Sequence, residues 1–447
     1  MTGPVSSERS GWRFPPAFWS ANVVELFERA AHYAMFISIT LYLTNVVGFD
    51  DVDAAWISGF FTAGLYFLPP FTGAFADSIG FRRAILLAFA LLTTGYAALG
   101  ALPYKATVLP ALVILMVGGS FIKSIITGTV AKTSNAETRA RAFSIFYGMV
   151  NIGAFSGKSI AYPLRIELGV EYVNFFSAAM TLLALVTVFL FYRGVDVRGE
   201  GKGIRETWQA FLRVVSNVRL LALIVIVAGF WMIQQQMYAT MPKYVLRTVG
   251  PGAAPEWIAN VNPLVVVTCV VLITGLTKRW KAITAINVGM ILMPLSALLM
   301  ASAPLLERLA GPEVGIFPGI TAHPVTVTLI VGIVVQGLAE CFISPRYLEF
   351  FSLQAPKGEE GLYLGFGHLH SFISAILGFG ISGYLLARYC PDPRTLTAEA
   401  LPTAYVNAHV IWYTFAAIGL AAALALFVYS RVVAARHAGN SPGKETA

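Results

Sequence analysis

Residues 107–131 read TVLPALVILMVGGSFIKSIITGTVA, a stretch of 25 residues with a single charged side chain, Lys123. A helix that crosses the hydrocarbon core of a bilayer needs about 20 mainly apolar residues. The stretch therefore predicts a membrane-spanning helix. Lys123 itself is a candidate functional residue, because a charge inside a span is costly and usually serves a function.

Comparable apolar stretches recur along the whole chain of 447 residues, of which 57% are hydrophobic and 12% are charged. A soluble domain would be about 45–50% apolar and about 25% charged. This composition excludes an ordinary soluble enzyme and a disordered protein. We predict an all-α integral membrane protein with twelve transmembrane helices in two six-helix bundles. The predicted spans are residues 18–47, 53–76, 82–102, 107–131, 142–164, 172–193, 219–246, 257–277, 282–303, 324–348, 361–388 and 407–432.

Basic residues predict the orientation of these spans. With the N-terminus inside, 21 of the 31 Lys and Arg residues fall on cytoplasmic segments, as the positive-inside rule requires. An even number of spans puts both termini on that side. We therefore expect a multi-pass protein of the cell (inner) membrane with both termini cytoplasmic. The basic cytoplasmic face accounts for the net charge of +8, so no nucleic-acid partner is expected.

One long polar stretch, beginning at Arg193 and ending at Arg219, separates two groups of six spans. The strings TGAFADSIGFRRAI and TGLTKRWKAI follow the second and eighth spans at equivalent places, a weak internal repeat that basic loops at regular intervals would also explain. Two six-span halves around a binding site near the bilayer midplane form a known transporter arrangement. The predicted segments are an N-terminal bundle (1–195), a cytoplasmic linker (196–218) and a C-terminal bundle (219–447).

The first predicted span carries five ionisable or hydroxyl-bearing side chains on one face. At about 100° per residue, Glu25, Glu28, Arg29, His32 and Tyr33 fall on the same side of a helix. This face must point away from lipid, because charged groups in the hydrocarbon layer are expensive. We interpret it as one wall of a hydrated cavity with a role in proton coupling. The alternative is that ion pairs here only hold helices together.

Other predicted spans add polar side chains that would also be costly in lipid. We expect them to line the same cavity and to contact a solute with ionised groups. The substrate-binding candidates are Arg29, Tyr33, Lys123, Tyr147, Asn151, Lys158, Trp231, Gln234, Gln235, Asn262 and Glu340.

Several short motifs resemble the proton-coupled oligopeptide transporters, a branch of the major facilitator superfamily. Glu25-Leu-Phe-Glu28-Arg29, followed by Tyr33, resembles the ExxER signature of that family. The match continues in the same order along the chain. The further motifs are GAFADSIGFRR (73–83), FIK (121–123), FSIFY (143–147), NIGAF (151–155), FWMIQQQ (230–236), NPL (262–264) and ECFISP (340–345).

In that family a proton travels inward with a di- or tripeptide. By resemblance, Glu28 and Arg29 belong to the proton-coupling group, Lys123 to the peptide-carboxylate site and Glu340 to the peptide amino-group site. From the residues themselves we add Glu25 and His32 to the proton-coupling candidates. The resemblance also implies a cytoplasmic gate formed by Asp77, Arg82 and Arg83.

The sequence thus predicts a proton-coupled symporter that works by alternating access. Its expected substrates are small zwitterionic or anionic solutes, foremost di- and tripeptides or peptide-like compounds. Two alternatives stay open: a proton-antiport exporter of organic anions or drug-like compounds, and a non-transporting membrane receptor on the same fold.

We expect no enzymatic activity, because motifs for ATP binding or hydrolysis are missing from the sequence. The proton is the expected coupling ion, without a further cofactor. No metal site is predicted, because His368 and His370 lack the i,i+4 spacing of a helical metal pair. The expected partners are a small-molecule substrate and the lipid bilayer, and the expected state is a monomer.

Overall fold

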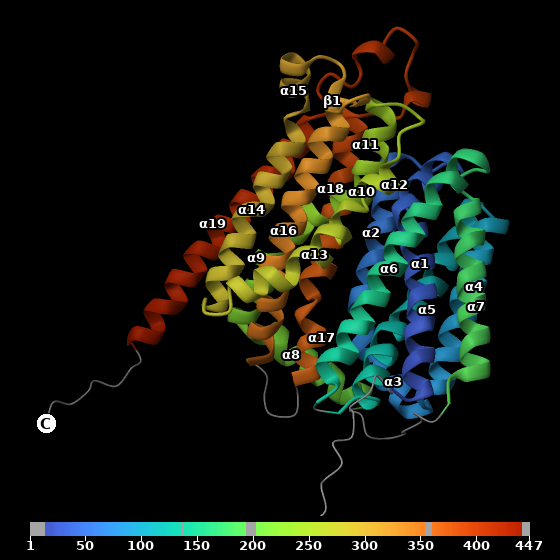
Figure 1. Ribbon diagram of the computed structural model, residues 1–447, viewed down its shortest axis with the longest axis vertical. Coiled ribbons are helices and arrows are strands. Elements are labelled where there is room, and N and C mark those ends of the chain that lie inside the picture. The colour runs from blue at the N-terminus through green and yellow to red at the C-terminus, as the bar shows by residue number, and fades with distance from the viewer. Residues whose placement is uncertain (1–13, 136, 194–202, 354–359, 440–447) are drawn as a thin grey trace, which may run out of the picture.

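The computed structural model of the protein describes residues 14–135, 137–193, 203–353 and 360–439. These residues are almost entirely helical, and Figure 1 shows the helices of the two chain halves as two groups standing side by side. The predicted all-α class and two-bundle arrangement are confirmed. The boundaries of the three predicted segments stay predictions.

Each of the twelve predicted spans corresponds to one helix or to consecutive helices. Among the described residues, nine helices are long and apolar enough to cross a membrane. The first, second and fifth predicted spans are helical too. The first and fifth are more polar, and the second is divided at Leu68.

In the first half of the chain, Asp50 is the N-cap of the second span. Its side chain accepts a hydrogen bond from the Asp53 backbone N–H at 2.7 Å. The same span breaks before Pro69-Pro70, because proline cannot donate a backbone hydrogen bond inside a helix. The helices of this half are α1 (Pro16–Asn45), α2 (Asp51–Phe67), α3 (Pro69–Ile79), α4 (Phe81–Ala101), α5 (Lys105–Lys132), α6 (Arg139–Glu167) and α7 (Tyr172–Phe191).

The second half has more interruptions within its spans. It also contains an amphipathic helix in the predicted linker and a short antiparallel hairpin, neither of which the sequence analysis foresaw. Its elements are α8 (Ile204–Ser216), α9 (Val218–Gln234), α10 (Gln236–Ala239), α11 (Met241–Thr248), α12 (Pro255–Ile258), α13 (Val261–Leu276), α14 (Ala282–Ala301), α15 (Ala303–Ala310), β1 (Val314–Phe317), β2 (Ile320–Ala322), α16 (Pro324–Leu353), α17 (Glu360–Gly367), α18 (Leu369–Tyr389), the 3₁₀ turns η1 (Pro393–Thr395) and η2 (Leu401–Thr403), and α19 (Val410–Gly439).

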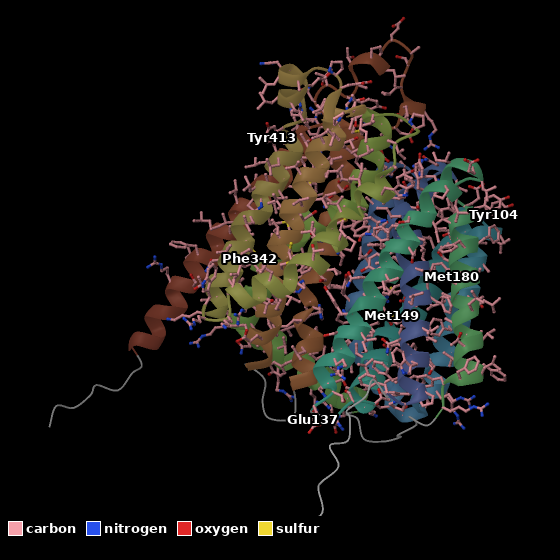
Figure 2. All side chains as sticks on the ribbon, in the orientation of Figure 1. Tyr104, Glu137, Met149, Met180, Phe342 and Tyr413 are labelled. Carbon is pink, nitrogen blue, oxygen red and sulfur yellow. The ribbon has the colours of Figure 1, made fainter. Side chains whose placement is uncertain are left out.

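Each half has its own buried apolar cluster, one drawn mainly from α1–α7 and one mainly from α8–α19. The outer flanks are apolar as well: Val271 is 79% exposed and Leu424 is 64% exposed. Figure 2 shows mostly carbon along these flanks, with nitrogen atoms gathered mainly towards the two ends of the molecule. Lipid is the solvent that suits such a surface.

Close packing of α1 against α6 fixes the polar face of α1. A Cβ atom on Gly157 of α6 would lie 2.2 Å from the Ala30 carbonyl oxygen of α1, and one on Gly153 would lie 2.6 Å from the Leu26 carbonyl oxygen. Only glycine lets the two backbones approach so closely. The orientation of α1 within its bundle is therefore set by backbone contact.

Candidate functional site

The polar face of α1 carries a buried ion-pair group. The Arg29 guanidinium contacts the Glu28 carboxylate, and its Nε lies 3.2 Å from Glu25 Oε1. Both carboxylates are almost fully buried, whereas Arg29 keeps 19% of its side chain exposed. A nearby cation favours the ionised form of a buried carboxylate, so a proton bound by either glutamate would weaken its attraction to Arg29.

Lys123 lies within α5 and extends its side chain into a cavity rather than into lipid. Its Nζ is 5.5 Å from the centre of the Tyr66 ring, and it interacts electrostatically with Arg29 and Glu25. Among the described residues, none lies within ion-pair distance of its ammonium group. Lys123 is thus a cation in mid-span that is open to a ligand.

The matching group of the second half surrounds Glu340 on α16. Glu340 Oε2 accepts hydrogen bonds from Gln234 Nε2 at 3.1 Å and from Asn262 Nδ2 at 3.3 Å. Neutral amides hold this carboxylate without cancelling its charge. Gln235 is buried beside Gln234, and Trp231 is half-buried one turn earlier on α9.

Tyr33 connects the two groups. Its ring lies 6.4 Å from the Tyr238 ring of the second half, between centroids, and its side chain is near enough to the α1 charges and to Glu340 to feel the charges of both. Lys158 of α6 lies beside it, with Nζ 5.6 Å from the Tyr33 ring centre, and interacts with Glu340 as well. The predicted residues of both halves therefore meet in one region.

Lys158 itself is only 1% exposed and donates a hydrogen bond to the Ala259 carbonyl oxygen at 3.0 Å. It therefore joins the two halves here and is not open to a solute in this conformation.

Three further candidates lie around this region. Tyr147 is 44% exposed and interacts electrostatically with Glu340 and Tyr33. The Asn151 amide donates to the Tyr147 backbone carbonyl oxygen at 2.7 Å, so it is bound within its own helix. His32 stacks on the Phe36 ring, with centroids 5.3 Å apart, and meets Tyr33 edge-on. His32 is thus held among aromatic rings next to the ion-pair group.

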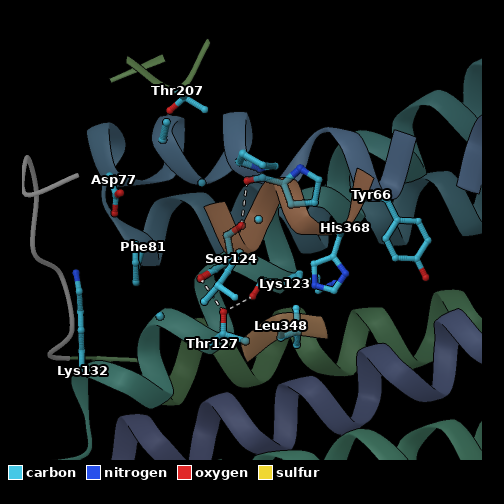
Figure 3. A pocket seen from close by; sticks show the side chains of 17 residues that line it. Tyr66, Asp77, Phe81, Lys123, Ser124, Thr127, Lys132, Thr207, Leu348 and His368 are labelled. Carbon is cyan, nitrogen blue, oxygen red and sulfur yellow. Dashed lines mark hydrogen bonds between the residues drawn. The ribbon is translucent and has the colours of Figure 1, made fainter. Parts of the chain in front are cut away.

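A cavity of about 620 Å³ reaches towards the charged region from one end of the molecule. Figure 3 shows Asp77 and Lys132 at one side of this cavity, and Lys123, Tyr66 and His368 at the other. Helices of both halves line it. This end of the molecule, which we call the open end, is the one that the basic residues predict to be cytoplasmic.

Of the three predicted gate residues, the structure places Asp77 on the cavity. Arg82 donates from Nη2 to the Phe189 carbonyl oxygen at 3.1 Å, which connects α4 with the end of α7 in the same half. Arg83 is exposed. A gating role for these residues stays a prediction.

The opposite end is closed by an ionic cluster that the sequence analysis did not identify. Asp51 of α2 binds Lys243 at 2.7 Å and Arg247 at 2.7 Å, both on α11. Arg165 of α6 binds Glu256 of α12 at 2.5 Å. Each pair joins the two halves. We call these five residues the closed-end latch.

The sequence does contain a signal for the two cations that bind Asp51 in the latch. Lys243 and Arg247 are one helical turn apart at the end of a span, where two cations on one face need an anionic partner. The partner is 192 residues away from Lys243 in the sequence, so only the fold identifies Asp51.

A loop beyond α18 adds to the closed end. Asp392 accepts hydrogen bonds from Arg394, which lower the pKa of the Asp392 carboxyl to about 2. Arg394 in turn donates to the Thr44 carbonyl oxygen of α1 at 3.2 Å. The loop therefore ties the second half to the first at the same end.

Among the described residues, no three His, Cys, Asp or Glu side chains gather as potential metal ligands. The arrangement instead offers buried carboxylates that can exchange protons and cations that can bind an anion.

Comparison with known proteins gives concordant results. The family model for the Major Facilitator Superfamily matches residues 23–317. A multidrug resistance protein, MdtH, of Photorhabdus laumondii is 23% identical over 355 residues, which are 79% of this chain and 82% of that protein. Dipeptide and tripeptide permease B of Photorhabdus asymbiotica is 24% identical over 460 residues, covering 88% and 91%.

Among solved structures, that of a peptide transporter in complex with sulfate superposes with a TM-score of 0.73. It is 18% identical in sequence, and the superposition covers 95% of this chain and 96% of that one. At this level of identity the likeness establishes the fold.

Proposed function

Because this chain belongs to the Major Facilitator Superfamily, we propose that it is a proton-coupled symporter of small zwitterionic or anionic solutes, with short peptides first among them. The observation that carries the proposal is the meeting of two charged groups around Tyr33: Glu25, Glu28 and Arg29 from one half, and Glu340 from the other. A receptor that only binds would not need so many titratable groups in one place.

The proposed cycle follows from the charges. If Glu25, Glu28, Arg29 and Lys123 are all ionised, the group on the first half is neutral. A proton bound by Glu28 or Glu25 adds one positive charge and frees Arg29 to bind an anionic group of the solute. Glu340 offers the matching site for a solute amine. Release of the proton on the other side of the membrane restores the ion pair and releases the solute.

The state of the two ends fits alternating access. The closed-end latch joins the halves on one side, and the cavity opens on the other. With the basic end cytoplasmic, this is an inward-facing conformation. In this proposal the protein works in the inner membrane as a monomer with both termini cytoplasmic, and Asp77, Arg82 and Arg83 close the cavity in the opposite conformation.

The membrane potential can drive such a cycle. Moving one charge through 100 mV is worth about 2.3 kcal/mol, which concentrates a solute about fiftyfold. A second candidate, proton antiport with export of organic anions or drug-like compounds, is favoured by the similarity to the multidrug resistance protein. Both use the same buried carboxylates and differ in the direction of solute flux.

The experiment is transport in proteoliposomes with an imposed pH gradient, for the wild type and for Glu28→Gln. We expect the variant to lose gradient-driven accumulation while it keeps solute exchange without a gradient, because Gln cannot bind or release a proton. Glu167→Gln, which alters an exposed glutamate on α6, is the matched control and is expected to behave as the wild type.

Accumulation by Glu28→Gln that still follows the pH gradient would remove Glu28 from the coupling mechanism. Proton flux measured together with solute flux separates the alternatives. Flux in the same direction means symport, flux in opposite directions means antiport, and substrate binding without flux would mean a receptor.

A further inference from the structure

The inner end of the cavity presents a histidine that the proposed function does not use. His368 lines the cavity together with Lys123 and Tyr66. We propose that His368 and Lys123 together bind an oxyanionic group of the transported solute, which makes His368 a specificity-determining residue for carboxylate-bearing solutes. The inference rests on the proposed transport function and adds His368 to the residues that recognise the solute.

The first support is the arrangement of the three side chains. Both basic side chains lie near the Tyr66 ring, with Lys123 Nζ 5.5 Å from the ring centre and the His368 ring centroid 6.5 Å from it at an interplanar angle of 29°. Figure 3 shows the three side chains near one another, on the side of the cavity away from Asp77.

The second support is the rigid backbone that carries His368. The eleventh span breaks here: α17 ends at Gly367 and α18 begins at Leu369. The carbonyl group of Gly367 at the break accepts a hydrogen bond from the Tyr347 hydroxyl at 2.9 Å. His370, the next histidine, is stacked on Trp231 with centroids 5.2 Å and planes 8° apart. Contacts on both sides of the break therefore fix the position from which His368 faces the cavity.

The third support is the charge balance of the cavity wall. Among the described residues that line the cavity, Asp77 is the single acid, and it lies with Lys132 away from Lys123. Glu25 also interacts with Lys123, but it is already paired with Arg29 at 3.2 Å. At the inner end of the cavity, the Lys123 ammonium and the His368 imidazole therefore have hydrogen-bond donors available to an incoming anion.

The chemistry of the two side chains suits a carboxylate. The ammonium of Lys123 donates up to three hydrogen bonds, and an imidazole donates from either ring nitrogen according to its tautomer. Hydrogen bonds to an ionised acceptor are about twice as strong as those between neutral groups. A carboxylate could bind one donor at each oxygen, whereas an amide or ester in its place would lose the charge-assisted part of this binding.

The test measures binding of dialanine and of dialaninamide, which differ in the carboxylate, to the full chain in detergent by titration calorimetry. In His368→Gln we expect affinity for dialanine to fall about tenfold or more and affinity for dialaninamide to change less than about twofold. His409→Gln is the matched control, because His409 does not line the cavity. It is expected to change neither affinity.

A second variant, His368→Lys, puts an ammonium donor in place of the imidazole and is expected to keep the preference for dialanine. It also provides the test if His368→Gln fails to fold. An unchanged preference in His368→Gln, or an equal loss for both ligands, would overturn the role of His368 and leave the transport proposal intact. A wild-type protein without any preference for the carboxylate would contradict both this inference and the proposed substrate class.

Discussion

The two ends of the molecule join the halves by different means. At the closed end, the latch uses buried charges that bind one another directly across the interface between α2 or α6 and α11 or α12. At the open end, aromatic rings of the two halves contact one another. Phe67 of α2 meets Phe372 of α18 with centroids 5.5 Å apart, and Phe71 of α3 meets Phe366 of α17 at 6.4 Å.

The difference has a physical consequence. Separation of a buried ion pair leaves uncompensated charges, so such a contact is kept whole or lost as a unit. Aromatic rings attract each other over a range of offsets and angles, so they can slide while remaining in contact. The closed end therefore holds one geometry, while the open end can change its width. This suggests that the latch decides which side of the membrane the cavity faces.

The largest expected effect comes from Asp51→Asn. Asp51 is the shared partner of Lys243 and Arg247. Its loss leaves Lys243 without its carboxylate partner and leaves Arg247 with the more distant Asp392 carboxylate at 3.8 Å. We expect the closed end to be destabilised by about 3 kcal/mol. Spin labels on α2 and α18 at the closed end should report longer distances than in the wild type. A second pair on α3 and α17 at the open end should report shorter distances.

Asp53→Asn is the matched control, because Asp53 is exposed two residues further along α2. It should leave both distance distributions as in the wild type. Closed-end distances that stay the same in Asp51→Asn would mean that the latch does not set the conformation, and the contrast between the two ends would lose its functional meaning.

A smaller effect is expected from Glu256→Gln. This change removes the charge that faces Arg165, but Arg165 also donates to the Ala253 carbonyl oxygen at 2.7 Å and keeps that bond. We expect a loss of about 1.5 kcal/mol, the value of a hydrogen bond to a charged group. The same spin-label pairs should shift in the same direction as in Asp51→Asn, but less.

Glu171→Gln changes a glutamate that is not part of the latch and serves as the control. If Glu256→Gln shifted the distances as much as Asp51→Asn, the ranking of the two latch pairs would be wrong. The stability of the closed end would then depend on the number of ion pairs across it, and not on how many cations each carboxylate binds.

Much of the fold follows from the sequence. The apolar stretches indicate the spans, and the shared face of Glu25, Glu28 and Arg29 indicates which side of α1 avoids lipid. These features are local, because a helix contains both the residues and the geometry that relates them. The same reasoning found Lys123 and Glu340, since single charges are conspicuous in apolar stretches.

What the sequence could not supply depends on distant contacts. Lys158 appears as an open cation in the sequence, but the fold buries it against Ala259 of the other half. Asp51 lies at a helix start where acids are common as caps, so nothing local distinguishes it. His368 becomes interesting only because the eleventh span breaks beside it and turns it towards Lys123. Pairing across the two halves is a property of the assembled bundles.

The smallest effect concerns the loop at Asp392, which reinforces the closed end from outside the spans. The pKa of this carboxyl is about 2 in the folded protein, below the usual value of about 3.9 for aspartate in an unfolded chain. A lowered folded-state pKa stabilises the fold above the unfolded value, and this contribution is lost as the pH falls from about 4 to about 2. Because Asp392 is partly exposed, solvent screening keeps the contribution below about 1 kcal/mol.

Thermal unfolding of the wild type and of Asp392→Asn, followed from pH 5 downwards, measures this contribution. The wild type should be slightly more stable at pH 5, and the two curves should converge as the pH approaches 2, because protonated aspartic acid resembles asparagine in charge. A difference that is independent of pH would show that Asp392 acts through loop geometry rather than through its charge. The ionic character of the closed end would then be confined to the buried latch, where burial shields the carboxylates from water.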